Sequence, residues 1–418
     1  MEEKFEQVEK ILKKTGQEHL LKYIDLIPTD EGKKDLISDI EKIDFERLKQ
    51  LYSLSNQNFK NSMKTVMLEH IRVFDKSRFS DEENKEILKI GEDIIANNQY
   101  AVVTMAGGQG TRLGHKGPKG TFILNVKPEP KSLFQIIAEN LIKTNNKYGI
   151  ILNWYIMTST ENNDETVKYF EDNNYFGYNS ENVKFFKQGN LPLLSEDGKL
   201  VINSEYRIKY AASGNGTIYE AMLNDGIIDD MKKKGIKWVF IGSVDNALLN
   251  MVDPMLLGLT KKRGTEIASK TIVKNSPYEK VGVFCKKNGK PGVIEYSEIP
   301  ESLIEEVDEH GELMYGESHI MCNLYTLDAI EKIANVELPY HSAHKKVDFM
   351  QEDGNMFFAK EPNGYKYEAF IFDGFELFDD ITLYRGKREE NFAPVKNAEG
   401  VDSPETATKL YNDFWFKN

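Results

Sequence analysis

A short apolar run followed directly by a glycine-rich segment is the feature that most constrains this fold. The run at 101–105 reads AVVTM, and the segment at 105–120 reads MAGGQGTRLGHKGPKG. Residues 133–141 then carry apolar side chains at helical spacing. Strand, loop and helix in this order are typical of an open α/β sheet, in which a ligand binds beyond the carboxyl ends of the strands.

The same alternation continues along the chain. Further apolar runs predict buried strands at 150–157, 183–186 and 238–241, and helical stretches such as 218–234 lie between them. A turn at 286–290 predicts a hairpin. The fold class expected from this pattern is α/β, with a Rossmann-like, mostly parallel or mixed sheet and helices on both faces.

Residues 1–96 lack the alternation of strands and helices, and their apolar spacing predicts a helical N-terminal region. Val8 and Leu12 recur on one helical face, and Ser80 with Glu83 forms a capping box that opens another helix. We expect these helices to pack as a bundle against a main catalytic domain at 97–385. Residues 386–418 are expected to form a short C-terminal segment.

Composition narrows the range of partners. The formal net charge of -13 disfavours a nucleic-acid polymer, although a few cations and backbone amides can still bind a small phosphate. Two cysteines are too few for a disulfide framework or a CxxC zinc site. The charged N-terminus lacks the apolar core of a signal peptide, and no apolar run is long enough to span a bilayer. We therefore expect a cytoplasmic monomer that does not associate with membranes.

The glycine-rich segment has the composition of a phosphate-binding loop. Four glycines lie within eight residues, and they are Gly107, Gly108, Gly110 and Gly114. They let the backbone approach a bulky anion and permit positive φ, so that successive N–H groups can face one oxygen cluster. Arg112 and Lys119 add positive charge. The string matches neither the Walker loop nor the GxGxxG dinucleotide fingerprint, so it belongs to another class.

The string AGGQGTRLG, followed closely by PKG, resembles the signature of the eukaryotic-type UDP-sugar pyrophosphorylases. Within that family it is most similar to the UDP-N-acetylglucosamine pyrophosphorylases, and the resemblance extends over most of residues 100–400. It implies that the loop binds the nucleotide. The residues concerned are Met105, Gly107, Gly108, Gly110 and Thr111.

Two later segments resemble the parts of this family that contact the base and the sugar. The string FFKQG at 185–189 implies that Gln188 contacts uracil, which suits an amide because it can both donate and accept. A second match, to the family's GNGG, implies that Gly214 contacts the nucleotide and that Asn215 and Gly216 contact the sugar. Thr217 departs from this pattern. Asn215 favours an N-acetylhexosamine, because the UDP-glucose enzymes tend to carry histidine there.

Asp245 follows the apolar run at 238–241, and a carboxylate at the end of a buried strand is a suitable Mg²⁺ ligand. The resemblance places this aspartate beside the metal and the sugar phosphate. The string VIEYSE at 293–298 resembles the family's VVEYSE, which implies that Glu295 accepts hydrogen bonds from sugar hydroxyls, with Tyr296 beside it.

The remaining matches lie toward the C-terminus. The segment at 320–325 resembles a sugar-contacting segment of the family, with Cys322 at its asparagine position and Asn323 one place later. The string EENFAPVKNA implies that Lys396 reaches the phosphates, and Lys366 is a further phosphate candidate. The pair His341 and His344 has a spacing compatible with one helical face but lacks a third ligand, which favours a structural role.

Together these matches imply a uridylyltransferase. It joins UTP to N-acetylglucosamine 1-phosphate, with Mg²⁺ as cofactor, and releases UDP-N-acetylglucosamine and pyrophosphate. A phosphate oxygen attacks the α-phosphorus directly, so catalysis consists of positioning and charge neutralisation. The residues expected to carry it out are Arg112, Lys119, Asp245 and Lys396, with Asp245 as the metal ligand.

Three alternatives remain open. The first is the same chemistry on glucose 1-phosphate or galactose 1-phosphate, which Thr217 and Cys322 keep possible. The second is a glycosyltransferase that uses a UDP-sugar, although such enzymes usually carry Asp-x-Asp and this chain has Asp-Asn-Ala at 245–247. The third is a non-catalytic nucleotide-sugar-binding protein, which would be expected to lack the charged residues that are all present here.

Overall fold

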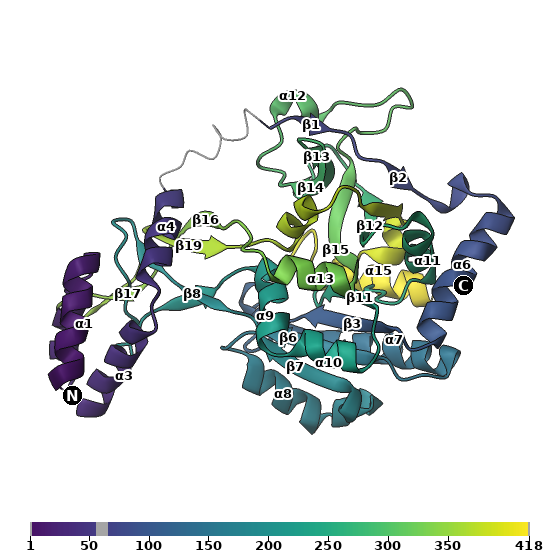
Figure 1. Ribbon diagram of the computed structural model, residues 1–418. Helices are drawn as coiled ribbons and strands as arrows, with labels where there is room; N and C mark the ends of the chain where they lie inside the picture. Colours follow the sequence, from purple (N-terminus) through teal and green to yellow (C-terminus); the bar gives the residue numbers. More distant parts are fainter. Residues whose placement is uncertain (1, 56–65, 417–418) are drawn as a thin grey trace. The chain divides into compact units, whose positions relative to one another are not determined.

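An eleven-stranded mixed sheet forms the centre of the larger of two units in the computed structural model, which describes residues 2–55 and 66–416 (Figure 1). Unit 1 is drawn from the described residues of Met1–Phe59, Gly189–Thr217 and Leu338–Phe370. Unit 2 is drawn from those of Lys60–Gln188, Ile218–Glu337 and Ile371–Asn418. These discontinuous units differ from the three consecutive segments expected from the sequence, because long-range packing joins stretches that no local pattern connects.

Eight strands of the unit 2 sheet lie in one row. In spatial order they are β2 (Val73–Phe74), β20 (Thr382–Arg385), β12 (Ile267–Val273), β15 (Glu317–Thr326), β11 (Trp238–Ser243), β3 (Tyr100–Met105), β6 (Asn153–Thr158) and β7 (Val183–Lys187). Strand β15 runs antiparallel to both of its neighbours, and every other pair in the row is parallel. The predicted fold class, a mostly parallel mixed sheet, is confirmed.

The predicted hairpin is also present. Strands β13 (Val283–Lys287) and β14 (Lys290–Ile294) are antiparallel around Asn288 and Gly289, both of which have positive φ. Strand β13 pairs on its other side with β1 (Leu68–Glu69), and it joins the row through one contact with β15. The four predicted parallel strands correspond to β3, β6, β7 and β11, with β6 beginning three residues later than expected.

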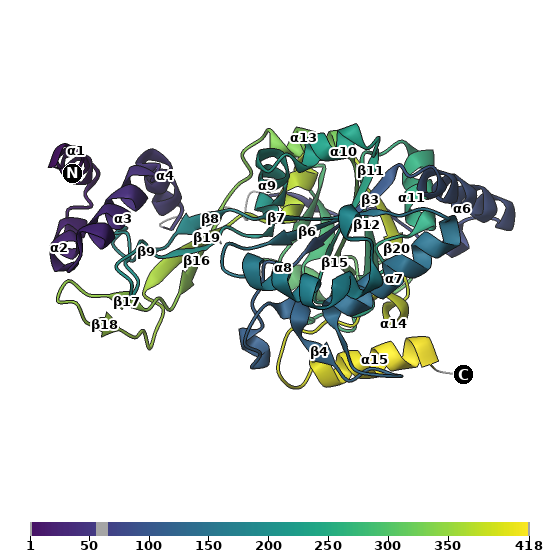
Figure 2. The same cartoon turned by 90° about the horizontal axis from the view of Figure 1, so that it is seen from below.

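Helices cover both faces of this sheet (Figure 2). On one face lie α9 (Ile218–Asn224), α10 (Ile227–Lys233) and α13 (Leu327–Ala334), and on the other lie α7 (Leu133–Tyr148) and α8 (Asn163–Asp172). The helical stretch predicted at 218–234 is divided into α9 and α10 by Gly226, which has a φ of 68°. Alternate sheet residues such as Val102, Trp154 and Phe240 pack with apolar residues of α7 in one buried core.

The capping box opens α6 (Asp81–Ala96) as predicted, but this helix belongs to unit 2. It crosses α11 (Pro254–Arg263) at two glycines, where a Cβ on Gly91 would lie 1.9 Å from the Pro254 carbonyl oxygen. A Cβ on Gly258 would lie 1.8 Å from the Ile87 carbonyl oxygen. Only hydrogen at these two positions lets the helix backbones approach so closely. The unit is completed by α12 (Glu301–Ile304), α14 (Arg388–Asn391) and α15 (Pro404–Phe416).

Unit 1 combines four helices with short strands. The helices are α1 (Glu2–Thr15), α2 (His19–Leu26), α3 (Asp30–Glu41) and α4 (Phe45–Ser55). The strands are β8 (Asn190–Pro192), β9 (Leu194–Ser195), β10 (Tyr210–Ala212), β16 (His341–Lys345), β17 (Phe349–Met350), β18 (Met356–Phe357) and β19 (Gly364–Glu368). Helix residues Val8 and Leu36 share one buried core with Leu194 and Tyr367. The N-terminal helices therefore do not form the separate bundle expected from the sequence.

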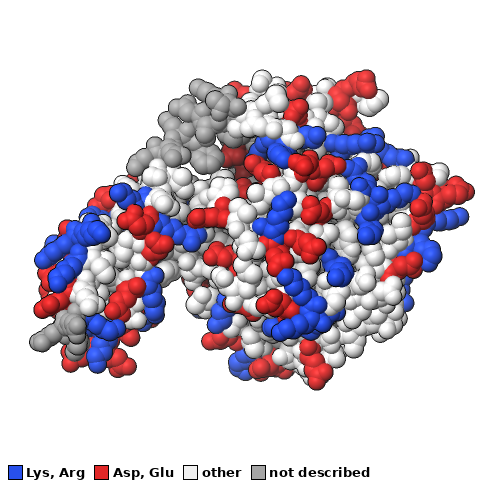
Figure 3. Space-filling view, viewed as in Figure 1, with Lys and Arg blue, Asp and Glu red and all other residues white. Residues whose placement is uncertain are grey.

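None of the described helices is long and apolar enough to cross a membrane. On the face of the described residues shown in Figure 3, basic and acidic side chains are interspersed rather than gathered into one basic field. This distribution agrees with the acidic net charge of the chain.

The helix crossing gives a direct test of the fold. We expect Gly258→Ala to lower the free energy of unfolding by about 1–3 kcal/mol, the usual cost of overpacking a core. Urea denaturation measures it, with the exposed Lys85→Ala on α6 as a control that changes stability by less than about 0.5 kcal/mol. An unchanged midpoint for Gly258→Ala would show that the two helices are not held this closely.

Candidate functional site

The glycine-rich loop leaves the carboxyl end of β3 and folds back on itself. The Gly110 N–H donates to the Gly117 carbonyl oxygen at 2.9 Å, and the Lys119 N–H donates to the Gly108 carbonyl oxygen at 3.0 Å. The Asn162 side chain, which has no exposed surface, donates to the Ala106 carbonyl oxygen at 2.9 Å. These bonds fix the loop at the sheet edge where open α/β sheets bind ligands.

The loop glycines are needed mainly for space. A Cβ on Gly107 would lie 2.6 Å from the Gln188 amide nitrogen, and one on Gly110 would lie 2.8 Å from the His115 ring. Of the four glycines that were expected to permit positive φ, only Gly114 has a left-handed backbone, with a φ of 67°. Gln188 is buried just past the end of β7, and its side chain lies directly against the loop.

Asp245 lies in the turn that follows β11, beside the end of β3. The Val244 N–H donates to the Met105 carbonyl oxygen at 3.1 Å, which joins this turn to the strand that carries the loop. The Lys119 ammonium group then reaches the Asp245 carboxylate at 3.2 Å. Both side chains are about four-fifths buried, at 17% and 21% exposed. This pair joins two predicted site residues that are 126 positions apart.

Lys396 lies on the same side of this turn. The Val395 N–H donates to the Asp245 carbonyl oxygen at 2.8 Å. Burial alone would raise the pKa of the Asp245 carboxyl, but the ammonium groups of Lys119 and Lys396 and a hydrogen bond from Ser243 hold that pKa below its usual value. The structure thus pairs Lys119 with Asp245 and joins the segment that carries Lys396 to the same turn, while the Lys396 ammonium group itself lies 3.8 Å from the Asp402 carboxylate. Asp245 is ionised at neutral pH.

Arg112 and Thr111 lie in the short helix η3 (Thr111–Leu113) and are exposed. Among the described residues, Arg112 takes no part in the ion pair between Lys119 and Asp245. The expected phosphate role of Arg112 is therefore not part of this charge cluster and remains a prediction.

The expected sugar residues of unit 2 lie on β15 and after β14. Cys322 stands opposite Gly242 of β11 and is 2% exposed. Asn323 is fully buried, and its side-chain oxygen accepts from the Ser269 hydroxyl at 2.9 Å. Glu295 and Tyr296 follow the end of β14, where Tyr296 is 44% exposed. The buried side chains of Cys322 and Asn323 do not reach solvent in this structure.

The other predicted residues belong to unit 1. A Cβ on Gly214 would lie 2.3 Å from the Ala369 carbonyl oxygen, and one on Gly216 would lie 2.6 Å from the Phe370 backbone. Asn215 lies between them in the short helix η7 (Asn215–Thr217). Lys366 on β19 is ion-paired with Glu368 at 2.7 Å. The Gly-Asn-Gly segment is therefore a tightly packed backbone crossing.

Asp245 could hold a magnesium ion. It offers an ionised, hard oxygen donor, and Mg²⁺ is commonly bound by one or two carboxylates together with substrate phosphates. Within 2–55 and 66–416, no three His, Cys, Asp or Glu side chains gather in a way that could hold a metal ion by themselves. His341 and His344 lie on strand β16 rather than a helix, so their spacing places them on opposite faces. A magnesium ion would therefore take most of its ligands from phosphates and water.

Sequence reasoning missed the residues that support this turn. Asn246 donates to the Asn391 carbonyl oxygen at 2.8 Å and accepts from the Ala393 N–H at 2.9 Å. Lys270 is 5% exposed in the middle of β12, which reads IASKTIV. A single lysine inside an apolar strand was the available signal, because buried lysines are nearly always paired.

A fixed loop at the carboxyl edge of a doubly covered sheet, with a lysine paired to a carboxylate beside it, is an arrangement typical of nucleotide-binding α/β enzymes. A family model described as UTP--glucose-1-phosphate uridylyltransferase matches residues 44–402. The chain belongs to this family of UDP-sugar pyrophosphorylases, which are UTP:sugar-1-phosphate uridylyltransferases.

Individual relatives agree with the family. The chain is 35% identical to the UDP-N-acetylglucosamine pyrophosphorylase of Saccharomyces cerevisiae, covering 96% of this chain and 85% of the relative. It is also 35% identical to UDP-N-acetylglucosamine diphosphorylase 1 of Arabidopsis thaliana, covering 96% and 81%. The crystal structure of the Trypanosoma brucei uridine diphosphate N-acetylglucosamine pyrophosphorylase superposes with a TM-score of 0.81 at 28% identity, covering 98% of this chain and 84% of that one.

The contact between the loop and Gln188 can be tested by steric substitution. We expect Gly107→Ala to displace the Gln188 amide and to weaken UTP binding about tenfold, because overpacking of this size costs about 1–3 kcal/mol. Gly108→Ala is the matched comparison, since a Cβ at that position meets nothing within 4 Å. Calorimetric titration with UTP measures both variants, and equal affinities would contradict the proposed packing.

Proposed function

We propose that this chain joins UTP to N-acetylglucosamine 1-phosphate, releasing UDP-N-acetylglucosamine and pyrophosphate. The observation that carries the proposal is the ion pair between Lys119 of the loop and Asp245, together with the backbone bond that joins the segment of Lys396 to the same turn. The names of the relatives in yeast and Arabidopsis support the choice of sugar. Asn215, where related UDP-glucose enzymes tend to carry histidine, supports it independently.

The reaction is a direct displacement. An oxygen of the sugar phosphate forms a bond to the α-phosphorus of UTP, and the bond from that phosphorus to the bridging oxygen of pyrophosphate breaks. The attacking oxygen is already anionic, so no side chain has to remove a proton. Lys119 and Lys396 orient the reacting phosphates and compensate the charge that accumulates around the α-phosphorus. Mg²⁺ held by Asp245 supplies further charge compensation when bound.

The other predicted site residues are assigned to the nucleotide or to the sugar. The backbone of the loop and Arg112 bind the β- and γ-phosphates, and Gln188 hydrogen-bonds to uracil. In unit 2, Glu295 accepts from the sugar hydroxyls, with Tyr296 beside it. In unit 1, Asn215 and Gly216 are the candidate sugar contacts. Cys322 and Asn323 are not assigned a sugar contact, because their side chains do not reach solvent. Lys366 is a secondary phosphate candidate, because its ammonium group is already paired with Glu368.

A panel of sugar 1-phosphates tests the function. The full chain is incubated with UTP, Mg²⁺ and the 1-phosphates of N-acetylglucosamine, glucose and galactose, and released pyrophosphate is measured. We expect the highest kcat/KM with N-acetylglucosamine 1-phosphate. A preference for glucose or galactose 1-phosphate would overturn the sugar assignment, and no pyrophosphate with any of the three would overturn the function.

Asp245 is the residue whose loss should be most damaging. We expect Asp245→Ala to lower kcat on the order of 10²–10³-fold, the scale for removing one preorganised electrostatic group. Asp229→Ala on α10 is the matched control, since it removes an exposed carboxylate from the same unit. Wild-type turnover in Asp245→Ala would remove this carboxylate from the site.

Base recognition gives a separate readout. We expect Gln188→Ala to reduce the preference for UTP over CTP, because the uracil edge loses a partner that both donates and accepts. Loss of one such hydrogen bond corresponds to about a tenfold change in the ratio of kcat/KM values. A ratio that stays constant would contradict the contact with uracil.

A further inference from the structure

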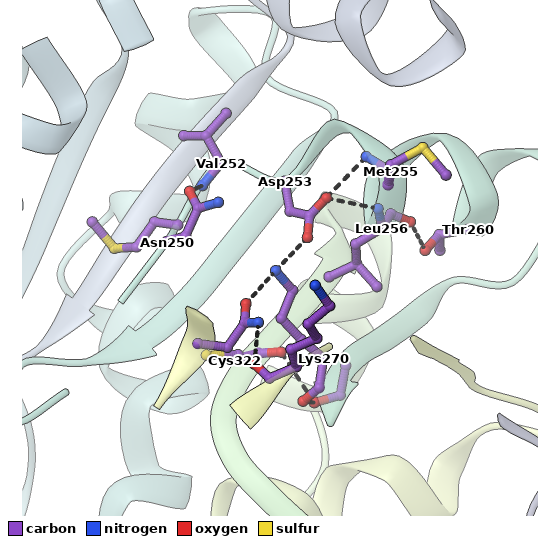
Figure 4. A network of polar contacts seen from close by, with 12 residues as sticks. Asn250, Val252, Asp253, Met255, Leu256, Thr260, Lys270 and Cys322 are labelled. Atoms are coloured by element: carbon purple, nitrogen blue, oxygen red, sulfur yellow. Dashed lines mark hydrogen bonds and ion pairs between the residues drawn. The ribbon is translucent and has the colours of Figure 1, made fainter. Parts of the chain in front are cut away.

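Lys270 is a buried lysine of β12 to which the proposed reaction gives no role. Lys270 is 5% exposed, and its ammonium group is ion-paired with Asp253 (Figure 4). Figure 4 shows the Asp253 carboxylate between this ammonium group and the first turn of α11, where it accepts from the Met255 N–H at 2.9 Å and the Leu256 N–H at 3.2 Å. Lys270 therefore occupies a fixed position, set by strand and helix together.

Burial of such a pair is weak evidence for a role in stability. Removing two charges from water costs about as much as their attraction returns, and apolar replacements of buried pairs are often neutral or stabilising. Ala268 and Ile272, which share a face of β12 with Lys270, lie in the apolar core, and a methionine of similar length would fill the same space. What a methionine could not provide is the hydrogen bond that Lys270 donates to Asn391.

That bond begins a continuous route to the site. The Lys270 ammonium group donates to the Asn391 side-chain oxygen at 2.9 Å. The Asn391 side-chain nitrogen donates to the Lys387 carbonyl oxygen at 2.7 Å, and this side chain packs so closely on Gly386 that a Cβ there would lie 2.6 Å away. Asn391, the last residue of α14, is thus fixed by contacts with Lys270, Lys387 and Gly386.

Asn246 links Asn391 by hydrogen bonds to the turn that contains Asp245. Its side chain donates to the Asn391 carbonyl oxygen and accepts from the Ala393 N–H, while the Ala247 N–H donates to the Ala393 carbonyl oxygen at 2.9 Å. The Val395 N–H then donates to the Asp245 carbonyl oxygen. Residues 392–396 lie in neither a helix nor a strand, so these bonds fix the segment just before Lys396, whose own N–H donates to the Asp402 carbonyl oxygen at 2.7 Å.

We propose that Lys270, Asn391 and Asn246 are positioning residues, which set the placement of Lys396 beside Asp245 for the uridylyl transfer. This inference rests on the proposed function, since it assumes that Lys396 contacts the reacting phosphates. It explains why a charged pair is buried under α11 rather than an apolar one. An error of about 1 Å in the placement of such a group can lower a rate about 100-fold, so small displacements are enough.

The test combines an apolar replacement with a double-mutant cycle. In the variant Lys270→Met with Asp253→Asn, no unpaired buried charge remains, and asparagine can still cap α11. We expect kcat with UTP and N-acetylglucosamine 1-phosphate to fall about 10- to 100-fold, while the melting temperature and both KM values change little. In a Lys396→Ala background, the same replacement should lower kcat by less than about twofold, because its effect passes through Lys396.

Two further variants support the comparison. Asn391→Ala removes the hydrogen bond to Lys270 while leaving the ion pair in place, so it can replace the double variant if that variant does not fold. We expect its loss of kcat to disappear in the Lys396→Ala background in the same way. Thr260→Val on α11 is the matched control, since it removes another buried hydrogen bond, to the Leu256 carbonyl oxygen, away from the route. We expect it to keep full kcat.

The outcomes separate the two proposals. Unchanged kcat in the Lys270 and Asn391 variants, or an equal loss with and without Lys396, overturns the positioning role and leaves the proposed function intact. Full turnover in Lys396→Ala alone overturns the phosphate role of Lys396, and the positioning role with it.

Discussion

The candidate site depends on charge compensation around one partly buried carboxylate. Asp245 follows a buried central strand, and its charge is favourable there because the Lys119 ammonium group pairs with it and the charge of Lys396 adds to this effect. An isolated charge at such a depth is costly, so the nearby positive charges keep the carboxyl of Asp245 ionised. The same positive groups suit the phosphates of a nucleotide, so in the proposed function one set of charges would stabilise the resting site and recognise the substrate.

Strand pairing and backbone hydrogen bonds bring these charged residues together from distant parts of the chain. The loop carrying Lys119 follows β3, Asp245 follows β11, and Lys396 lies in the irregular segment after α14. Parallel pairing of β3 with β11 brings the first two together at one edge of the sheet. The third arrives through bonds between 245–247 and 393–395. Rigid strands therefore fix two of the groups, and a polar network fixes the third.

The local elements of this protein could be predicted because each has a signal within a few residues. The loop string, the capping box at Ser80 and the hairpin at 286–290 are all recognisable in this way and are present. The interpretation of the loop glycines was less accurate, because the need for space at Gly107 arises from Gln188, which is far away in the sequence. Helical sequence at the N-terminus likewise did not reveal that its core partners are Leu194 and Tyr367.

The sequence by itself determined the fold class and the family and singled out Lys119, Asp245 and Lys396 as candidates, since motif strings and hydrophobic periods are local properties. Only the tertiary structure decided which residues meet. It assigned the discontinuous units, placed Arg112 outside the charge cluster and buried Lys270 against Asp253. The physical reason is that burial and pairing are set by contacts between residues far apart in the chain, and one sequence carries no record of those distances.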